Sequence, residues 1–210
     1  SKVASPKLHE KEIIRLNSDE IVELLDVLEN AELNSEHQSA YVRNNTKKRD
    51  LAIISLLLGT GIRVSECVGL NIDDIDFNNN AFTVTRKGGN RSTLYFSDEI
   101  KAVLIDYMEE RKEKNINEKA LFLSLRDKRI SVRAVEYLVK KYAKIISPLK
   151  KITPHKLRST YGTNLYKATK DIYVVAEVLG HKDVNTTKKH YAAISEDIKK
   201  EASTKVKLRN

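Results

Sequence analysis

The sequence has almost no cysteine and no long apolar run. Its 210 residues include one cysteine, Cys67, which excludes an internal disulfide framework and a metal site built from cysteines alone. Because Cys67 stands among Val64, Val68 and Leu70, we expect a buried structural thiol. The longest apolar stretch, Leu51 to Leu58, is far shorter than the roughly 20 residues of a membrane-spanning helix. The N-terminus has no signal-peptide pattern, so we expect a cytoplasmic, reducing setting and no membrane association.

Motifs for metals and nucleotides are also missing. No GxxxxGK[ST] run is present to bind nucleotide phosphates. The histidines His155, His181 and His190 have no HExxH or CxxC spacing, and the lysines around them would repel a cation. The sequence therefore predicts no metal and no cofactor. Any phosphoryl transfer would have to conserve the bond energy in a covalent intermediate.

Positive charge is concentrated at one end of the chain. The formal net charge is +9. Residues 140–210 carry 17 Lys and Arg against 6 Asp and Glu, a net of +11, so the remainder sums to −2. One basic end favours contact with a polyanion, most often nucleic acid. A solvated lysine surface is the alternative that charge alone leaves open.

The first seventy residues predict helices. Asn17 and Glu20 have capping-box spacing, and an apolar stripe follows them, so a helix is expected from residue 18. Residues 31–46 are polar and predict a loop. Residues 48–58 are hydrophobic on nearly all sides, which indicates a central helix. It should end at Gly59-Thr60-Gly61, with a short helix over 63–70.

The hydrophobic period then changes. Residues 72–77, 81–86 and 93–96 have the pattern of short strands, and turn sequences rich in Asn and Gly separate them. Helices are expected again over 98–114, 131–146, 154–168, 171–179, 183–191 and 195–205. The fold class that follows is mainly α, with a small three-stranded antiparallel β-sheet.

Several residues could bind a phosphate. Arg63 follows Gly59-Thr60-Gly61-Ile62 at a helix start, where forked guanidinium donors and backbone N–H groups suit an anion. A surface arginine paired with Glu66 is the alternative. Arg158 lies three residues after His155, so both should project from one face of a helix that Thr153 caps. His181 follows a glycine that ends a helix, and an incidental cap residue is possible there.

Two further residues could take part in chemistry. Lys87 is expected at a hairpin tip, from which it could protonate a leaving oxygen or contact phosphate. Most hairpin lysines do neither. Tyr191 is one of nine tyrosines, and its spacing alone does not distinguish a nucleophile from a packing residue.

Together these residues resemble the motifs of the tyrosine recombinases, or phage integrases. Gly59-Thr60-Gly61-Ile62-Arg63-Val64-Ser65-Glu66 resembles the box with the family's first catalytic arginine. Thr153-Pro154-His155-Lys156-Leu157-Arg158 resembles the HxxR box. Leu179-Gly180-His181 through Thr186-Thr187 to Tyr191 resembles the final box, and Lys87 lies between the first two boxes as the family's lysine does. The tyrosine falls nine residues after the histidine in many members, a position held here by His190. Tyr191, at ten, matches another common variant.

The resemblance implies a mechanism. Arg63, Arg158 and His181 would bind the scissile phosphate, and Tyr191 would attack it to form a 3′-phosphotyrosyl link. Lys87 would protonate the leaving 5′-oxygen, His155 would assist deprotonation of Tyr191, and Glu66 would support the site. The further DNA contacts that we expect are Arg86, Arg91, Lys156, Lys182, Lys188 and Lys189.

The resemblance also implies the wider organisation. Residues 1–10 would be a linker remnant and 11–210 the catalytic domain of a DNA breaking-rejoining enzyme, with the core-binding domain absent from this chain. Double-stranded DNA would be the partner, for integration or excision of a mobile element. We expect a monomer in isolation, a homotetramer in the synaptic complex and accessory DNA-bending proteins. The helix over 195–205 would dock on a neighbouring protomer or pack on its own domain. A type IB topoisomerase-like enzyme and a catalytically silent DNA-binding relative are the rival readings.

Overall fold

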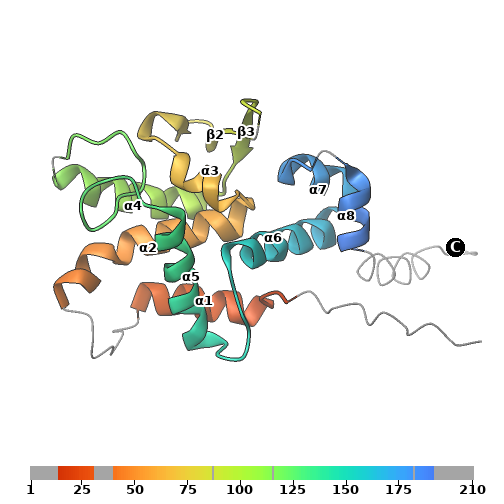
Figure 1. The fold of residues 1–210 in the computed structure, drawn as a ribbon, viewed down its shortest axis with the longest axis horizontal. Helices are drawn as coiled ribbons and strands as arrows, with labels where there is room; N and C mark the ends of the chain where they lie inside the picture. The colour runs from red at the N-terminus through yellow and green to blue at the C-terminus, as the bar shows by residue number, and fades with distance from the viewer. Residues whose placement is uncertain (1–13, 31–39, 87, 115, 182, 192–210) are drawn as a thin grey trace, which may run out of the picture.

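A computed structural model describes residues 14–30, 40–86, 88–114, 116–181 and 183–191 (Figure 1). The fold is mainly α with one small antiparallel sheet, as the sequence predicts. Its helices are α1 (Ser18–Asn30), α2 (Ala40–Thr60), α3 (Val64–Gly69), α4 (Asp98–Glu113), α5 (Val132–Ile146), α6 (Pro154–Thr169), α7 (Ile172–Leu179) and α8 (Val184–His190).

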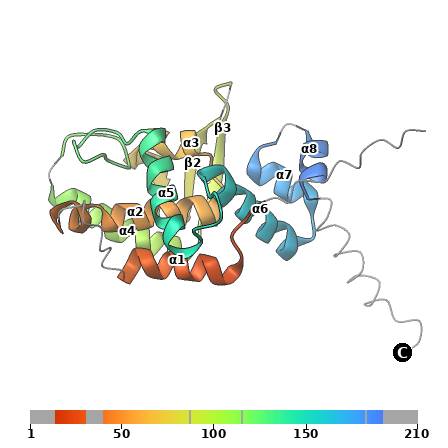
Figure 2. The same ribbon diagram turned by 60° about the horizontal axis from the view of Figure 1, so that its bottom comes forward.

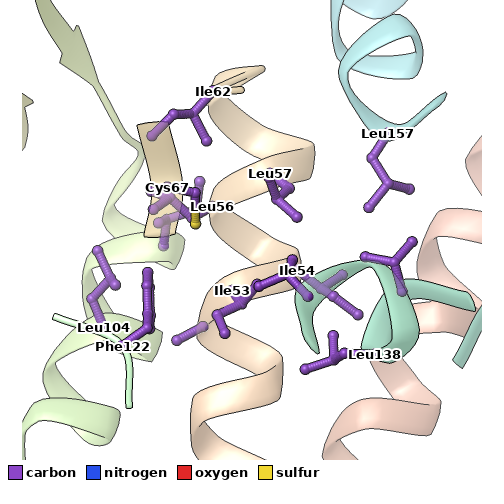
Figure 3. Close-up of a cluster of buried hydrophobic side chains, with 14 of the residues drawn as sticks. Ile53, Ile54, Leu56, Leu57, Ile62, Cys67, Leu104, Phe122, Leu138 and Leu157 are labelled. Atoms are coloured by element: carbon purple, nitrogen blue, oxygen red, sulfur yellow. The ribbon is translucent and has the colours of Figure 1, made fainter. Parts of the chain in front are cut away.

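Helix α2 is the centre of the molecule. Figure 3 shows Ile54 and Leu57 on the side of α2 that faces Leu138 of α5 and Leu157 of α6, and Ile53 on the opposite side of the helix. All five side chains are buried. This confirms the prediction of a central helix, because only a helix surrounded by other elements can be apolar on every side.

The start of α2 differs from the prediction. The loop expected over 31–46 is wrong from Ala40 onward, because α2 already begins there. Polarity suggested a loop, yet no Pro or Gly interrupts residues 40–58. Once a helix has nucleated, each added residue gains a hydrogen bond, so a polar tract can extend it.

The sheet comprises β1 (Ile75–Asp76), β2 (Ala81–Thr85) and β3 (Arg91–Tyr95), in the order β1-β2-β3. Thr85 pairs with Arg91, and this is the last pair between β2 and β3. The strand expected over 72–77 is largely wrong, since residues 72–74 form a 3₁₀ turn. The backbone N–H of Asn71 donates to the Asp74 carboxylate at 2.8 Å, which stabilises that turn instead of an extended strand.

Helix ends follow local capping. Asn17 and Glu20 exchange two backbone-to-side-chain hydrogen bonds of 2.8 Å at the start of α1, which confirms the predicted capping box. The Thr153 side chain caps α6, and Pro154 occupies its first turn. The helix expected over 195–205 lies outside the described residues.

Helices α7 and α8 lie at one end of the molecule, next to α6 (Figure 2). A second, smaller apolar cluster lies beneath them, formed by Tyr166, Val175, Leu179 and Tyr191. Cys67 belongs to the main core, and burial raises its pKa to about 12, so the predicted structural thiol is confirmed. No helix of the described ranges is long and apolar enough to cross a membrane.

Candidate active site

Three successive backbone carbonyls at the end of α7 each accept a hydrogen bond from a different arginine. Arg86 donates to Val178 at 3.0 Å, Arg158 donates to Leu179, and Arg63 donates to Gly180 at 3.1 Å. The last carbonyls of a helix lack partners within the helix and carry partial negative charge. We call these three side chains the arginine cluster.

Arg63 enters the cluster from the N-terminus of α3. Its guanidinium forms a 2.8 Å ion pair with Glu66, whose other carboxylate oxygen accepts the Arg63 backbone N–H at 3.1 Å. The Glu66 side chain is buried, whereas 37% of the Arg63 side chain is exposed. The pairing with Glu66 therefore holds Arg63 in place while leaving part of it accessible to an anion.

Arg158 is the buried member of the cluster. It projects from α6 and donates to the carbonyls of Gly61 and Leu179, which joins α6 to the turn before α3 and to the end of α7. Burial and the nearby Arg63 lower the pKa of Arg158 to about 10, so its guanidinium remains cationic at neutral pH. His155 lies in the first turn of the same helix, and its side chain is exposed, whereas Arg158 is buried.

The two histidines have different surroundings. The Nδ1 atom of His181 lies 2.7 Å from the Thr187 hydroxyl, and Thr187 is completely buried. This contact fixes the orientation of the His181 ring. Partial desolvation, together with the charges of Lys156 and Arg158, lowers the pKa of His155 below its ordinary value of 6.5. His155 is therefore mostly neutral at pH 7, a state in which an imidazole can accept a proton.

Tyr191 lies under α6 with only 2% of its surface exposed. A Cβ atom at Gly162 would come within 2.0 Å of its hydroxyl oxygen, so the hydroxyl lies directly against this glycine. Gly162 follows Arg158 by one helical turn, which places the phenol beside the arginine cluster. Burial raises the pKa of Tyr191, and the positive charges of Arg15 and Arg158 act in the opposite direction.

The structure thus brings together Arg63, Glu66, Arg158 and Tyr191, with His181 directly after Gly180. Lys87 and Lys182 lie outside the described residues, as does the side chain of Lys189. The other expected DNA contacts are exposed or half-buried: Arg91 lies 4.0 Å from Asp74, Lys188 lies over the Tyr173 ring, and Lys156 is in the first turn of α6. Arg86 turns inward and joins the arginine cluster.

Sequence reasoning missed three residues of this site. Thr187 belongs to the final motif box, but the sequence analysis assigned it no role, although it orients the ring of His181. Gly162 could have been noticed, because a glycine inside a helix costs about 1 kcal/mol relative to alanine and so indicates a packing reason. Arg15 gave no signal, yet its guanidinium carbon lies 5.7 Å from the centre of the Tyr191 ring.

No group of three or more His, Cys, Asp or Glu side chains is placed to hold a metal ion within the part of the chain that the structure describes. A cavity of about 530 Å³ lies elsewhere, between α2, α5 and the segment before α5. Arg49, Asp50 and Tyr137 line it, and none of the predicted site residues does. The arginine cluster is therefore the candidate active site.

The chain is similar to known proteins over most of its length. Residues 14–197 match the Phage integrase family. The chain is 39% identical over 186 residues to the tyrosine recombinase XerC of Caldanaerobacter subterraneus subsp. tengcongensis, covering 87% of this chain and 48% of that protein. It is 41% identical over 169 residues to XerS of Streptococcus agalactiae, covering 78% and 47%. The chain thus spans about half the length of these curated relatives.

Solved structures show the fold. The XerA recombinase matches with a TM-score of 0.75 and 26% identity, over 90% of this chain and 65% of that one. XerH bound to palindromic difH substrate, in a post-cleavage complex, matches with a TM-score of 0.75 and 22% identity, over 91% and 53%. The Tn1549 transposon integrase with transposon right end DNA gives 0.65 and 21%, over 92% and 67%.

Proposed function

The chain belongs to the phage integrase family, and from this premise we propose that it is the catalytic part of a site-specific DNA recombinase. It cuts and rejoins double-stranded DNA through a covalent 3′-phosphotyrosyl intermediate. The observation that carries the proposal is the position of the Tyr191 hydroxyl, one turn of α6 from Arg158 and its cluster. Forked cations next to a hydroxyl nucleophile are the groups that phosphodiester exchange needs.

In the first step, Tyr191 attacks the scissile phosphorus. A bond forms between its hydroxyl oxygen and phosphorus, and the bond from phosphorus to the 5′-oxygen breaks. His155 takes the proton of the phenol, and Lys87 supplies a proton to the leaving 5′-oxygen. Arg63, Arg158 and His181 neutralise the non-bridging oxygens, whose negative charge grows in the transition state.

In the second step, the 5′-hydroxyl of a partner strand gives its proton to Lys87 and attacks the phosphotyrosyl phosphorus. The bond to Tyr191 breaks, and the phenol regains its proton from His155. The link to Tyr191 conserves the energy of the original phosphodiester, so rejoining needs no nucleotide cofactor.

The relatives suggest the wider setting. The XerH and Tn1549 integrase structures contain their DNA, and we propose double-stranded DNA as the partner here. We retain residues 11–210 as the catalytic domain after a linker over 1–10, with synapsis by four subunits, accessory DNA-bending proteins and action in the cytoplasm on a mobile element. Docking of residues 195–205 on a neighbouring protomer also stays a prediction.

Covalent capture tests the proposal. The 210-residue chain is incubated with a library of randomised duplexes that carry a nick, so that the short 5′-hydroxyl fragment diffuses away after cleavage and traps the intermediate. We expect a heat-stable protein–DNA adduct whose modified peptide, sequenced by mass spectrometry, carries the nucleotide on Tyr191. Absence of an adduct, or an adduct on another residue, would contradict the proposal.

A second duplex with a free 5′-hydroxyl end then identifies the kind of enzyme. Joining of the captured strand to this second duplex is expected of a recombinase. Relaxation of supercoiled plasmid without joining between duplexes would instead indicate a nicking-closing enzyme of the topoisomerase type.

The cleavage rate should depend on the protonation of His155. Since only the neutral imidazole accepts a proton and its pKa lies below 6.5, single-turnover cleavage should be constant near pH 7 and fall as the pH drops through that pKa. His155→Gln should lower the rate about 100-fold and remove this acid limb. Lys156→Gln removes a neighbouring positive charge and should move the limb to higher pH. An unchanged limb in His155→Gln would assign it to another group.

A further inference from the structure

Arg86 leaves the end of β2 and points back toward α7. Its Nη2 atom donates to the Val178 carbonyl at 3.0 Å. Its Nε and Nη1 atoms are also buried, and within the described ranges they have no hydrogen-bond acceptor. Two donors of one guanidinium are thus removed from water without a partner, which is costly for a charged group.

Gly180 makes room for this side chain. A Cβ atom there would lie 1.3 Å from Nη1 of Arg86 and 2.4 Å from its guanidinium carbon. The planar group therefore lies directly against the backbone between Leu179 and His181. Gly180 also adopts a φ of +59°, which glycine accepts readily. Gly180 therefore meets two requirements: it adopts the positive φ of the turn after α7, and its lack of a Cβ atom lets the Arg86 guanidinium lie against the backbone.

The electrostatic surroundings of Arg86 favour an anion. Burial and the positive charge of Arg63 lower its pKa, and the negative charge of Glu66 acts in the opposite direction. Glu66 is already paired with Arg63 at 2.8 Å. Three guanidiniums and one carboxylate leave an excess of positive charge in a largely buried site.

We propose that Arg86 is a third phosphate-binding arginine: its guanidinium, which lies against Gly180 in this structure, turns outward when DNA binds, so that its unpartnered Nε and Nη1 donors reach a non-bridging oxygen of the scissile phosphate. Arg63 and Arg158 bind the same phosphate from the other elements of the cluster. The inference rests on the proposed function and adds a catalytic residue to it. Its alternative is a purely structural role, in which Arg86 ties the β2–β3 hairpin to α7 through the Val178 carbonyl.

A substrate without the phosphate charge distinguishes the two roles. Single-turnover cleavage is measured on a captured nicked duplex with either a normal scissile phosphate or a methylphosphonate, in which a neutral methyl group replaces one non-bridging oxygen. Arg86→Met should slow cleavage of the normal substrate about 100-fold and slow cleavage of the methylphosphonate far less. Arg126→Met, at an exposed arginine outside the arginine cluster and the expected DNA contacts, should affect both substrates little and equally.

Two further measurements keep the test decisive. Arg86→Lys retains the charge but not the fork, so it should recover folding, measured by thermal unfolding, and recover only part of the rate. Inorganic phosphate at fixed ionic strength should raise the Tm of the wild-type chain more than that of either Arg86 variant. An equal loss of rate on both substrates, or an equal rise in Tm, would overturn the proposal for Arg86. Lack of cleavage by the wild type would count against the recombinase function instead, and the phosphate measurement would still decide the role of Arg86.

Discussion

Replacing Tyr191 with phenylalanine is expected to eliminate the covalent DNA adduct completely while leaving the fold intact. The change removes one oxygen atom, the one that lies against Gly162. The ring keeps its packing with Tyr166, whose centre is 5.9 Å away, and with the rest of the smaller apolar cluster. Cleavage of the captured nicked duplex should therefore be undetectable, whereas DNA binding and thermal unfolding should change little.

Tyr166→Phe is the matched control for this variant. Tyr166 belongs to the same cluster and is also buried, so it loses a hydroxyl from nearly the same surroundings. Adduct formation in Tyr166→Phe should stay close to that of the wild type. Residual adduct in Tyr191→Phe, mapped to a different side chain, would transfer the nucleophile to that residue.

Arg158→Lys should reduce the cleavage rate by about 1,000-fold, the larger end of what loss of one preorganised donor to a developing negative charge costs. Lysine keeps the positive charge, but a single ammonium cannot donate to the Gly61 and Leu179 carbonyls and to a phosphate in the geometry of a guanidinium. The variant should also be less stable, because a buried carbonyl that loses its donor costs about 1–3 kcal/mol. Single-turnover kinetics and urea denaturation measure the two effects separately.

A second buried arginine provides the control. Arg111 of α4 donates to the carbonyls of Glu118 and Ala120, outside the arginine cluster. Arg111→Lys should lose a similar amount of unfolding free energy and keep nearly all of its cleavage rate under conditions in which both variants are folded. If the two variants lose the same fraction of activity, the effect of Arg158 would be one of stability alone.

Local patterns predicted the elements of this site better than its interior. Thr153 and Pro154 correctly predict the start of α6, and Gly180 correctly predicts the end of α7. Helix ends can be predicted in this way because capping depends on a few adjacent residues. The motif boxes also selected Arg63, Arg158 and His181, which the structure brings to the end of α7. The roles assigned to these residues await the experiments above.

Tertiary contacts are what the sequence could not reveal. Arg86 was expected to face DNA from a hairpin, but the carbonyl of Val178, 92 residues away in the chain, accepts its hydrogen bond. Charge patterns treat every arginine as a surface residue, so they give no sign that Arg158 is buried. The early start of α2 was also not predicted. The polar residues before Lys48 were interpreted as a loop, although no helix-breaking residue is present from Ala40 onward.

The end of α7 has a consequence for the order in which the chain acquires its activity. During translation, Arg63, Arg86 and Arg158 are synthesised before residues 178–180. The backbone carbonyls of those later residues accept hydrogen bonds from all three arginines. Domains fold during synthesis as their segments emerge, so a nascent or truncated chain that lacks α7 has all three guanidiniums but not the adjacent carbonyls that accept a hydrogen bond from each of them. The arginine cluster, on which the proposed cleavage depends, is therefore completed only after residues 178–180 have been made.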